Sequence, residues 1–99
     1  MNEEAWAAAK ARWPRGTWIN GRVVQHAPFG VFLDVDCPGA IGLILITEFR
    51  APPHRMTQRE FPPIGSSVKS CVLAFDDRNH QVRLTLIPEA RQVEPPEPI

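Results

Sequence analysis

The stretch from Trp18 to Val35, which reads WINGRVVQHAPFGVFLDV, decides the fold of this chain. Apolar and polar side chains alternate along both of its halves, and a Pro-Phe-Gly turn separates them. A period of two is typical of β-strands that bury one face. The stretch therefore predicts a β-hairpin with strands over 18–25 and 31–35. The side chains expected to face inward are Ile19, Gly21, Val23, Val31, Leu33 and Val35.

Three further segments with strand character follow the hairpin, over 41–46, 68–75 and 82–86. Turn-forming residues separate the hairpin from the third strand and the fourth strand from the fifth. A long connection over 47–65, rich in proline and arginine, links the third strand to the fourth, and one helical turn is expected near 55–59. Five short strands with one long link predict an all-β protein, a five-stranded Greek-key barrel of the OB-fold type. The second and third strands of that fold usually carry its binding face.

The two ends of the chain have a different character from the barrel. Residues 2–13 predict a short helix, capped by Asn2, with acidic residues near its start, basic residues near its end and Pro14 beyond it. Trp6, Ala9 and Trp13 recur at helical spacing and form one apolar face. We therefore expect three parts: a helix packed on the barrel over 1–14, an OB-fold domain over 15–88, and a disordered, charged and proline-rich tail over 89–99.

Composition and motifs argue against a catalytic role. The chain has 99 residues, a formal net charge of zero and two cysteines without metal or redox spacing. Its three histidines lie in separate turns or loops, and no zinc, nucleotide-loop or nucleophile motif occurs. The sequence therefore predicts no catalytic residue, no metal site and no cofactor. The longest apolar run is too short to span a membrane and the chain begins without a secretory signal, so a cytoplasmic protein is expected.

An ordered series of short motifs runs through the predicted barrel. The motifs are Gly16-x-x-x-x-Gly21-Arg-Val23, Pro28-Phe-Gly-Val-Phe-Leu33, Gly42-Leu43, Gly65-x-x-Val68, and Val72-Leu-x-x-Asp76 followed by Val82-x-Leu84-Thr85. In this order and spacing they resemble the S1 RNA-binding domain family. The resemblance implies an OB-fold that binds single-stranded RNA.

The resemblance also implies which positions contact RNA. Phe29 and Phe32 match the two aromatic residues of the family's first turn and second strand, and Asp76 matches the acidic residue that closes its fourth strand. An exposed aromatic ring is a platform on which any base stacks. Solvent-facing strand positions add three cations that can meet phosphates: Arg22, Lys69 and Arg83. Arginines 50, 55 and 59 of the long connection extend this basic path.

The affinity expected from these residues is low. Two stacking platforms supply roughly 2–6 kcal/mol, whereas a micromolar dissociation constant needs about 8 kcal/mol. Between Arg15 and Leu86 there are eight basic and six acidic residues, so the electrostatic attraction for phosphates is weak. The sequence thus predicts a weak, non-catalytic RNA-binding module.

A second function stays open at this stage, namely docking of a protein partner or of a second copy. The third strand is the reason to consider docking, because residues 40–46 are apolar on both faces and only one face of a barrel strand looks inward. The neutral net charge favours this alternative. So do Leu45, where the family often has histidine, and Gln81, where it often has a basic residue.

Overall fold

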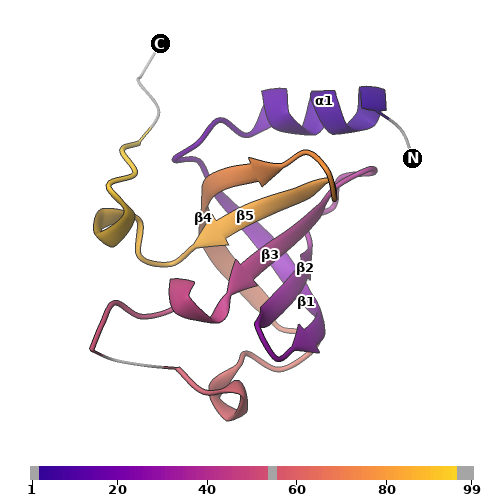
Figure 1. Ribbon diagram of the computed structural model, residues 1–99. Helices are drawn as coiled ribbons and strands as arrows, with labels where there is room; N and C mark the ends of the chain where they lie inside the picture. The colour runs from indigo at the N-terminus through magenta and orange to yellow at the C-terminus, as the bar shows by residue number, and fades with distance from the viewer. Residues whose placement is uncertain (1–2, 54–55, 96–99) are drawn as a thin grey trace.

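Five strands form a closed barrel in the computed structural model, which describes residues 3–53 and 56–95. The order around the barrel is β1-β2-β3-β5-β4, with β3 and β5 parallel and the other pairs antiparallel (Figure 1). The predicted OB-fold and its strands are confirmed, with ends that differ by a residue or two. The strands are β1 (Trp18–Ala27), β2 (Gly30–Asp34), β3 (Ile41–Leu45), β4 (Ser67–Asp76) and β5 (Gln81–Thr85).

The barrel interior holds the apolar side chains that the alternation placed inside. Each such side chain contributes roughly 1.5–3 kcal/mol when it is removed from water, so this core is the main source of stability. Most of their neighbours along β1 and β2 are exposed or half-buried, as a period of two requires. The fully buried aliphatic residues are Val23, Val31, Leu33, Ile44, Val72, Val82 and Leu84.

Gly30 marks the closest approach of two strands in the barrel. It pairs with Leu45 of β3, and a Cβ at this position would press against the carbonyl oxygen of Ile44 and lie 2.9 Å from the Cα of Leu45. These are backbone atoms of a paired strand, which cannot move aside. The close pairing of β2 with β3 therefore leaves room only for a glycine at position 30.

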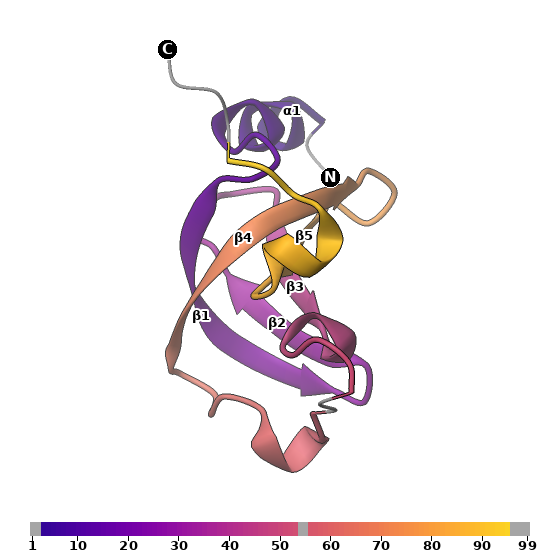
Figure 2. The ribbon, with the colours of Figure 1, turned by 90° about the vertical axis from the view of Figure 1, so that its left-hand side faces the viewer.

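Helix α1 (Glu3–Arg12) closes one end of the barrel (Figures 1 and 2). Trp6 is 2% exposed and belongs, with Ala9 and Trp13, to the same core cluster as the strand residues. Asn2, the expected cap, lies outside the described residues. Within 3–53 and 56–95, no helix has the length and apolar character needed to cross a membrane.

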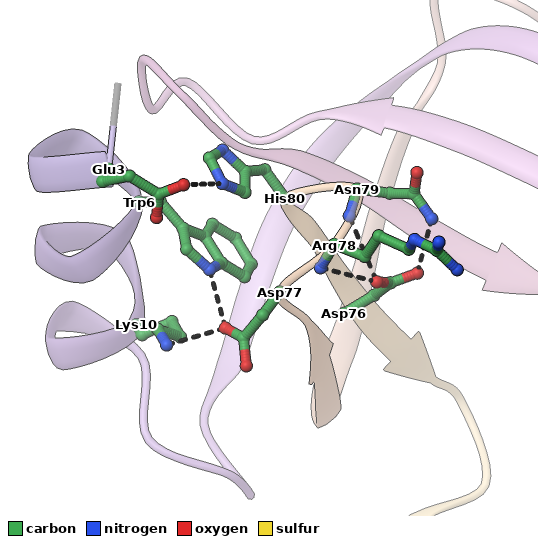
Figure 3. Close-up of polar contacts among 8 residues, drawn as sticks. All are labelled: Glu3, Trp6, Lys10, Asp76, Asp77, Arg78, Asn79 and His80. Atoms are coloured by element: carbon green, nitrogen blue, oxygen red, sulfur yellow. Dashed lines mark hydrogen bonds and ion pairs between the residues drawn. The ribbon is translucent and has the colours of Figure 1, made fainter. Parts of the chain in front are cut away.

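Polar contacts hold α1 to the turn between β4 and β5 (Figure 3). The indole Nε1 of Trp6 donates a hydrogen bond to Asp77 Oδ1 at 2.8 Å, and Lys10 Nζ reaches the same oxygen at 2.7 Å. The His80 ring stacks on the Trp6 ring, with centroids 5.0 Å apart. The hydrogen bonds from Lys10 and Trp6 lower the pKa of Asp77. The helix is therefore fixed by both apolar burial and a charged anchor.

The connection between β3 and β4 closes the opposite end of the barrel. It contains the 3-10 turns η1 (Ile46–Glu48) and η2 (Gln58–Glu60), and Phe61 from this segment is buried in the core cluster. The helical turn expected near 55–59 is found at η2, which begins later because Thr57 and Glu60 form a capping box. Arg55 lies outside the described residues.

The structure departs from the sequence at the carboxyl end, where a disordered tail was expected from Glu89. The segment instead forms the 3-10 turn η3 (Pro88–Arg91), and Val93 beyond it is buried. Arg91 donates a hydrogen bond from Nε to Glu48 Oε1 at 2.9 Å, and its Nη2 lies 2.9 Å from Glu48 Oε2. Glu48 is only 6% exposed, so its charge requires this partner. Residues 96–99 lie outside the described residues.

We predict that Trp6→Ala lowers the melting temperature by more than ten degrees. Removing a buried tryptophan costs about 3–5 kcal/mol, and about 1 kcal/mol shifts the melt of a domain of this size by roughly 4–8 °C. Circular dichroism melts measure the effect, with Ala8→Ser on the exposed side of α1 as control. An unchanged melt for Trp6→Ala would show that α1 does not belong to the folding unit.

We also predict that Arg91→Ala destabilises the domain by about 1–3 kcal/mol, because it leaves the buried Glu48 carboxylate without its cation. Chemical denaturation gives the free energy of unfolding, and Glu94→Ala, which removes an exposed charge three residues further on, should match the wild type. If Arg91→Ala also matches the wild type, the carboxyl end is dispensable as the sequence first suggested.

Candidate nucleic-acid interface

Three side chains from three strands lie in one row on the outside of the barrel. Phe32 of β2 pairs with Leu43 of β3, and Leu43 pairs with Arg83 of β5. The chain neighbours of Phe32 and Arg83 are fully buried, so these side chains project outward as the sequence predicts. We call this surface the aromatic face and define it by Phe29, Phe32, Leu43, Asp76 and Arg83.

Two phenylalanine rings form one end of the aromatic face. Phe29 in the turn between β1 and β2 is 50% exposed, and Phe32 beside it is half-buried. Their rings meet edge to face, with centroids 5.9 Å apart and planes at 88°. Edge-to-face packing fixes the rings relative to each other and leaves the Phe29 ring open to solvent. The face therefore carries a packed pair of aromatic rings, of which the Phe29 ring is half-exposed.

Asp76 and Arg83 form the other end of the aromatic face. The Asp76 carboxylate accepts hydrogen bonds from Asn79 Nδ2 at 3.0 Å and from the backbone N–H groups of Arg78 and Asn79 (Figure 3). It also accepts one from Arg83 Nη2 at 3.1 Å. The bonds from Asn79 and then the Arg83 guanidinium lower the pKa of Asp76. With its acceptors occupied in this way, Asp76 serves to shape the turn and to hold Arg83.

Gln81, which stands where the resembled family often has a basic residue, has a role of its own. Its side-chain oxygen accepts a hydrogen bond from Arg83 Nε at 3.2 Å. Arg83 is thus held by Gln81 through Nε and by Asp76 through Nη2. An arginine has five N–H donors, so the held group keeps donors for a phosphate. Gln81 therefore departs from the family pattern but helps to position Arg83, the cation of the aromatic face.

The outer side of β3 is less open than its sequence suggests. Leu43 is 2% exposed although it points away from the barrel core, and Ile41 and Leu45 are half-buried. Leu43 lies between Phe32 and Arg83 in the row described above, so the chain covers it with its own side chains. The apolar outer face that motivated the docking alternative is therefore mostly accounted for within the chain.

Arg22 and Lys69 do not join the aromatic face, although the sequence grouped all six residues as one site. Arg22 of β1 pairs with Asp34 and Ser67, and Lys69 of β4 pairs with Asn20. Both cations are exposed on the outer side of β1 and β4, and Asp34 follows Phe32 on the outward side of β2. The structure therefore brings four of the predicted residues together on the aromatic face and leaves Arg22 and Lys69 on β1 and β4.

The described part of the chain offers little for metal or thiol chemistry. Within 3–53 and 56–95, no three histidine, cysteine or acidic residues are grouped to hold a metal ion. Cys37 is half-buried and Cys71 is buried, and both are free thiols. Burial raises the pKa of Cys71, which keeps that thiol protonated.

Comparison with known proteins places the chain in a family. No family model matches it. The small ribosomal subunit protein bS1 of Rickettsia typhi is 30% identical over 86 residues, which are 87% of this chain. This chain belongs to the S1 domain family. The S1 domain described here spans 15% of the length of that relative.

Solved structures share the fold of this S1 domain. The solution structure of GSP13 from Bacillus subtilis matches with a TM-score of 0.61 at 24% identity, over 88% of this chain and 64% of that one. The complex of a/eIF2alpha, aDim2p and rRNA from Pyrococcus horikoshii contains a match with a TM-score of 0.62 at 24% identity, over 80% of this chain and 49% of that one. Both likenesses establish the fold.

We predict that Asn79→Ala raises the pKa of Asp76 more than Arg83→Gln does, since the hydrogen bond from the Asn79 side-chain amide is the largest cause of its lowered value and the bond from Arg83 is a smaller one. Carboxyl carbon shifts followed by NMR across acidic pH measure it. Because the folded-state pKa lies below the unfolded one, the Asp76 contacts stabilise the fold above the ordinary carboxyl pKa and are lost as pH falls through the lowered value. An Asp76 titration that moves only in Arg83→Gln would contradict this assignment.

Proposed function

We propose that this S1 domain is a non-catalytic module that binds single-stranded RNA weakly across its aromatic face. The observation that carries the proposal is the open Phe29 ring, packed edge to face on Phe32, on the same face as a positioned arginine. The bS1 relative is named as a ribosomal protein, and the Pyrococcus horikoshii complex includes rRNA. Both names support a nucleic-acid ligand.

Bases and phosphates have separate places on the proposed interface. A base stacks on the exposed Phe29 ring and contacts Phe32, and such stacking contributes about 1–3 kcal/mol per base. The phosphate that follows meets Arg83, whose guanidinium is held by Asp76 and Gln81 and so loses little freedom on binding. Asp76 is proposed as a positioning residue rather than a contact.

Arg22 and Lys69 are proposed as peripheral phosphate contacts. They lie on β1 and β4, outside the row formed by Phe32, Leu43 and Arg83, and Arg22 pairs with the acidic Asp34. The formal net charge of zero supplies no general attraction for phosphates, so binding should depend on the aromatic rings more than on salt. The weak electrostatic attraction supports stacking as the main contribution to the binding free energy. It also supports a low affinity for RNA.

Docking through β3 is not retained as a second function. Leu43 is buried between Phe32 and Arg83, and the remaining outward side chains of the strand are half-buried. The proposal that the module is non-catalytic rests on the chemistry of the aromatic face, where the one carboxylate is occupied by four hydrogen bonds. A carboxylate so engaged is poorly placed to accept a proton from a substrate.

We predict that Phe32→Ala weakens binding of a labelled single-stranded oligonucleotide by about five-fold to a hundred-fold, since it removes roughly 1–3 kcal/mol of stacking. Fluorescence anisotropy measures the dissociation constant, and the cost to folding should stay near 1–2 kcal/mol because the ring is half-buried.

The matched control is Trp18→Ala, which removes an aromatic ring that is 46% exposed on β1, away from the aromatic face. Its RNA affinity should equal that of the wild type. If Trp18→Ala weakens binding and Phe32→Ala does not, RNA binds to the other side of the barrel and the proposal is wrong.

A further inference from the structure

A cavity of about 640 Å³ lies beside the barrel, outside the aromatic face. Its walls come from η1, from residues 50, 52, 53 and 56 of the connection that follows it, and from the carboxyl-terminal turn η3. In two views at right angles, η1 and η3 lie on the same side of the barrel (Figures 1 and 2). Sites for small molecules have volumes of roughly 300–1,000 Å³, so this cavity is large enough for one. Its walls include Ile46, Arg50, Pro52, Met56 and Arg91.

The two arginines of the cavity differ in how firmly they are held. Arg91 makes two bonds to the buried Glu48 carboxylate and a third, at 3.2 Å, to the carbonyl oxygen of Thr47. Its guanidinium is therefore fixed in place. Arg50 contacts Glu60 at 3.1 Å, and both side chains of this pair are exposed. An exposed ion pair contributes little, so an anion in the cavity can replace Glu60 as the partner of Arg50 at small cost.

The remaining walls are apolar. Ile46, Pro52 and Met56 offer aliphatic and thioether surface, against which a flat ring can pack. The fork of N–H donors in a guanidinium matches the oxygens of a phosphate, and two such groups border the same cavity. The combination fits a ligand that carries both an apolar ring and a phosphate.

The cavity also adjoins the aromatic face. The backbone N–H of Ile46 donates a hydrogen bond to the carbonyl oxygen of Phe29 at 2.8 Å, so a wall residue of the cavity is bonded to the residue of the open ring. The segment that carries the Phe29 ring is therefore joined directly to the first wall of the cavity. This proximity favours a nucleotide over other phosphorylated ligands.

We propose that this cavity binds one nucleotide, with its base against Pro52 and Met56 and its phosphate between Arg50 and Arg91. The nucleotide is either free or part of a bound strand, and only the second case rests on the function proposed above. In both cases the ligand chemistry is the same, a nucleobase joined to a phosphate.

The first test is an NMR titration of the whole chain, labelled with nitrogen-15, with adenosine 5′-monophosphate. Saturable shifts of the Thr47, Met56 and Arg91 amides are expected, and adenosine without the phosphate should bind at least about ten-fold more weakly, because a hydrogen bond to a charged group is worth about that factor. Arg50→Ala should weaken nucleotide binding to a similar extent. Its melt should match the wild type, since the exposed pair with Glu60 adds little stability.

The matched control is Arg59→Ala, which removes the same charge from the exposed neighbouring turn η2 and should bind the nucleotide like the wild type. Equal losses in Arg50→Ala and Arg59→Ala would show general charge attraction and overturn the proposal. So would the absence of cavity shifts with both the mononucleotide and a short oligoadenylate.

The oligoadenylate separates the two sources of the nucleotide. If cavity amides shift with the oligonucleotide and Arg50→Ala removes those shifts, the occupant is a nucleotide of the strand; shifts with the mononucleotide alone assign the cavity to a free nucleotide. If Phe32→Ala loses oligonucleotide binding but neither ligand shifts the amides of the cavity residues, only the inference about the cavity is overturned. If the amides of the cavity residues shift with a ligand but Phe32→Ala binds the oligonucleotide like the wild type, only the function proposed for the aromatic face is overturned.

Discussion

The parallel pairing of β3 with β5 is the contact on which the rest of the structure depends. It closes the barrel, and it is the pairing that sets Arg83 beside Leu43 and so in the same row as Phe32. It also directs the chain after β5 back toward η1, where Leu86 N–H donates to the carbonyl oxygen of Glu48 at 2.9 Å. Without that return, Arg91 would not reach Glu48. The aromatic face and the cavity thus follow from one strand pairing.

A barrel of this size has a small core, and segments outside the strands complete it. A domain of about a hundred residues buries a smaller fraction of its surface than a larger one, so each added contact matters. Helix α1 adds Trp6 at one end, and the connection between β3 and β4 adds Phe61 at the other. The carboxyl-terminal turn adds the ion pair between Arg91 and Glu48. These additions also leave the outside of β2, β3 and β5 free for a ligand.

The sequence predicted what is local and missed what depends on distant contacts. Alternation identified the hairpin and sent Phe32 outward, because Val31 and Leu33 on either side must be inside. It did not reveal which outward residues share a side, since that depends on strand order, and so Arg22 and Lys69 were grouped with Phe32. The partnership of Arg91 with Glu48 spans 43 positions of the chain, and composition alone favoured disorder there. The role of Gln81 could not be predicted from the sequence either, because it depends on the hydrogen bond that its side chain accepts from Arg83.

Mapping a bound single-stranded oligonucleotide on the labelled protein by NMR locates the RNA-binding surface directly. The largest amide shifts should fall on Phe29, Phe32 and Arg83, on the strands and turn that carry the aromatic face. Trp18 and Lys69, which lie on β1 and β4, should show small shifts. Shifts concentrated on β1 and β4, with Phe29 and Phe32 unmoved, would show that RNA does not bind to the aromatic face.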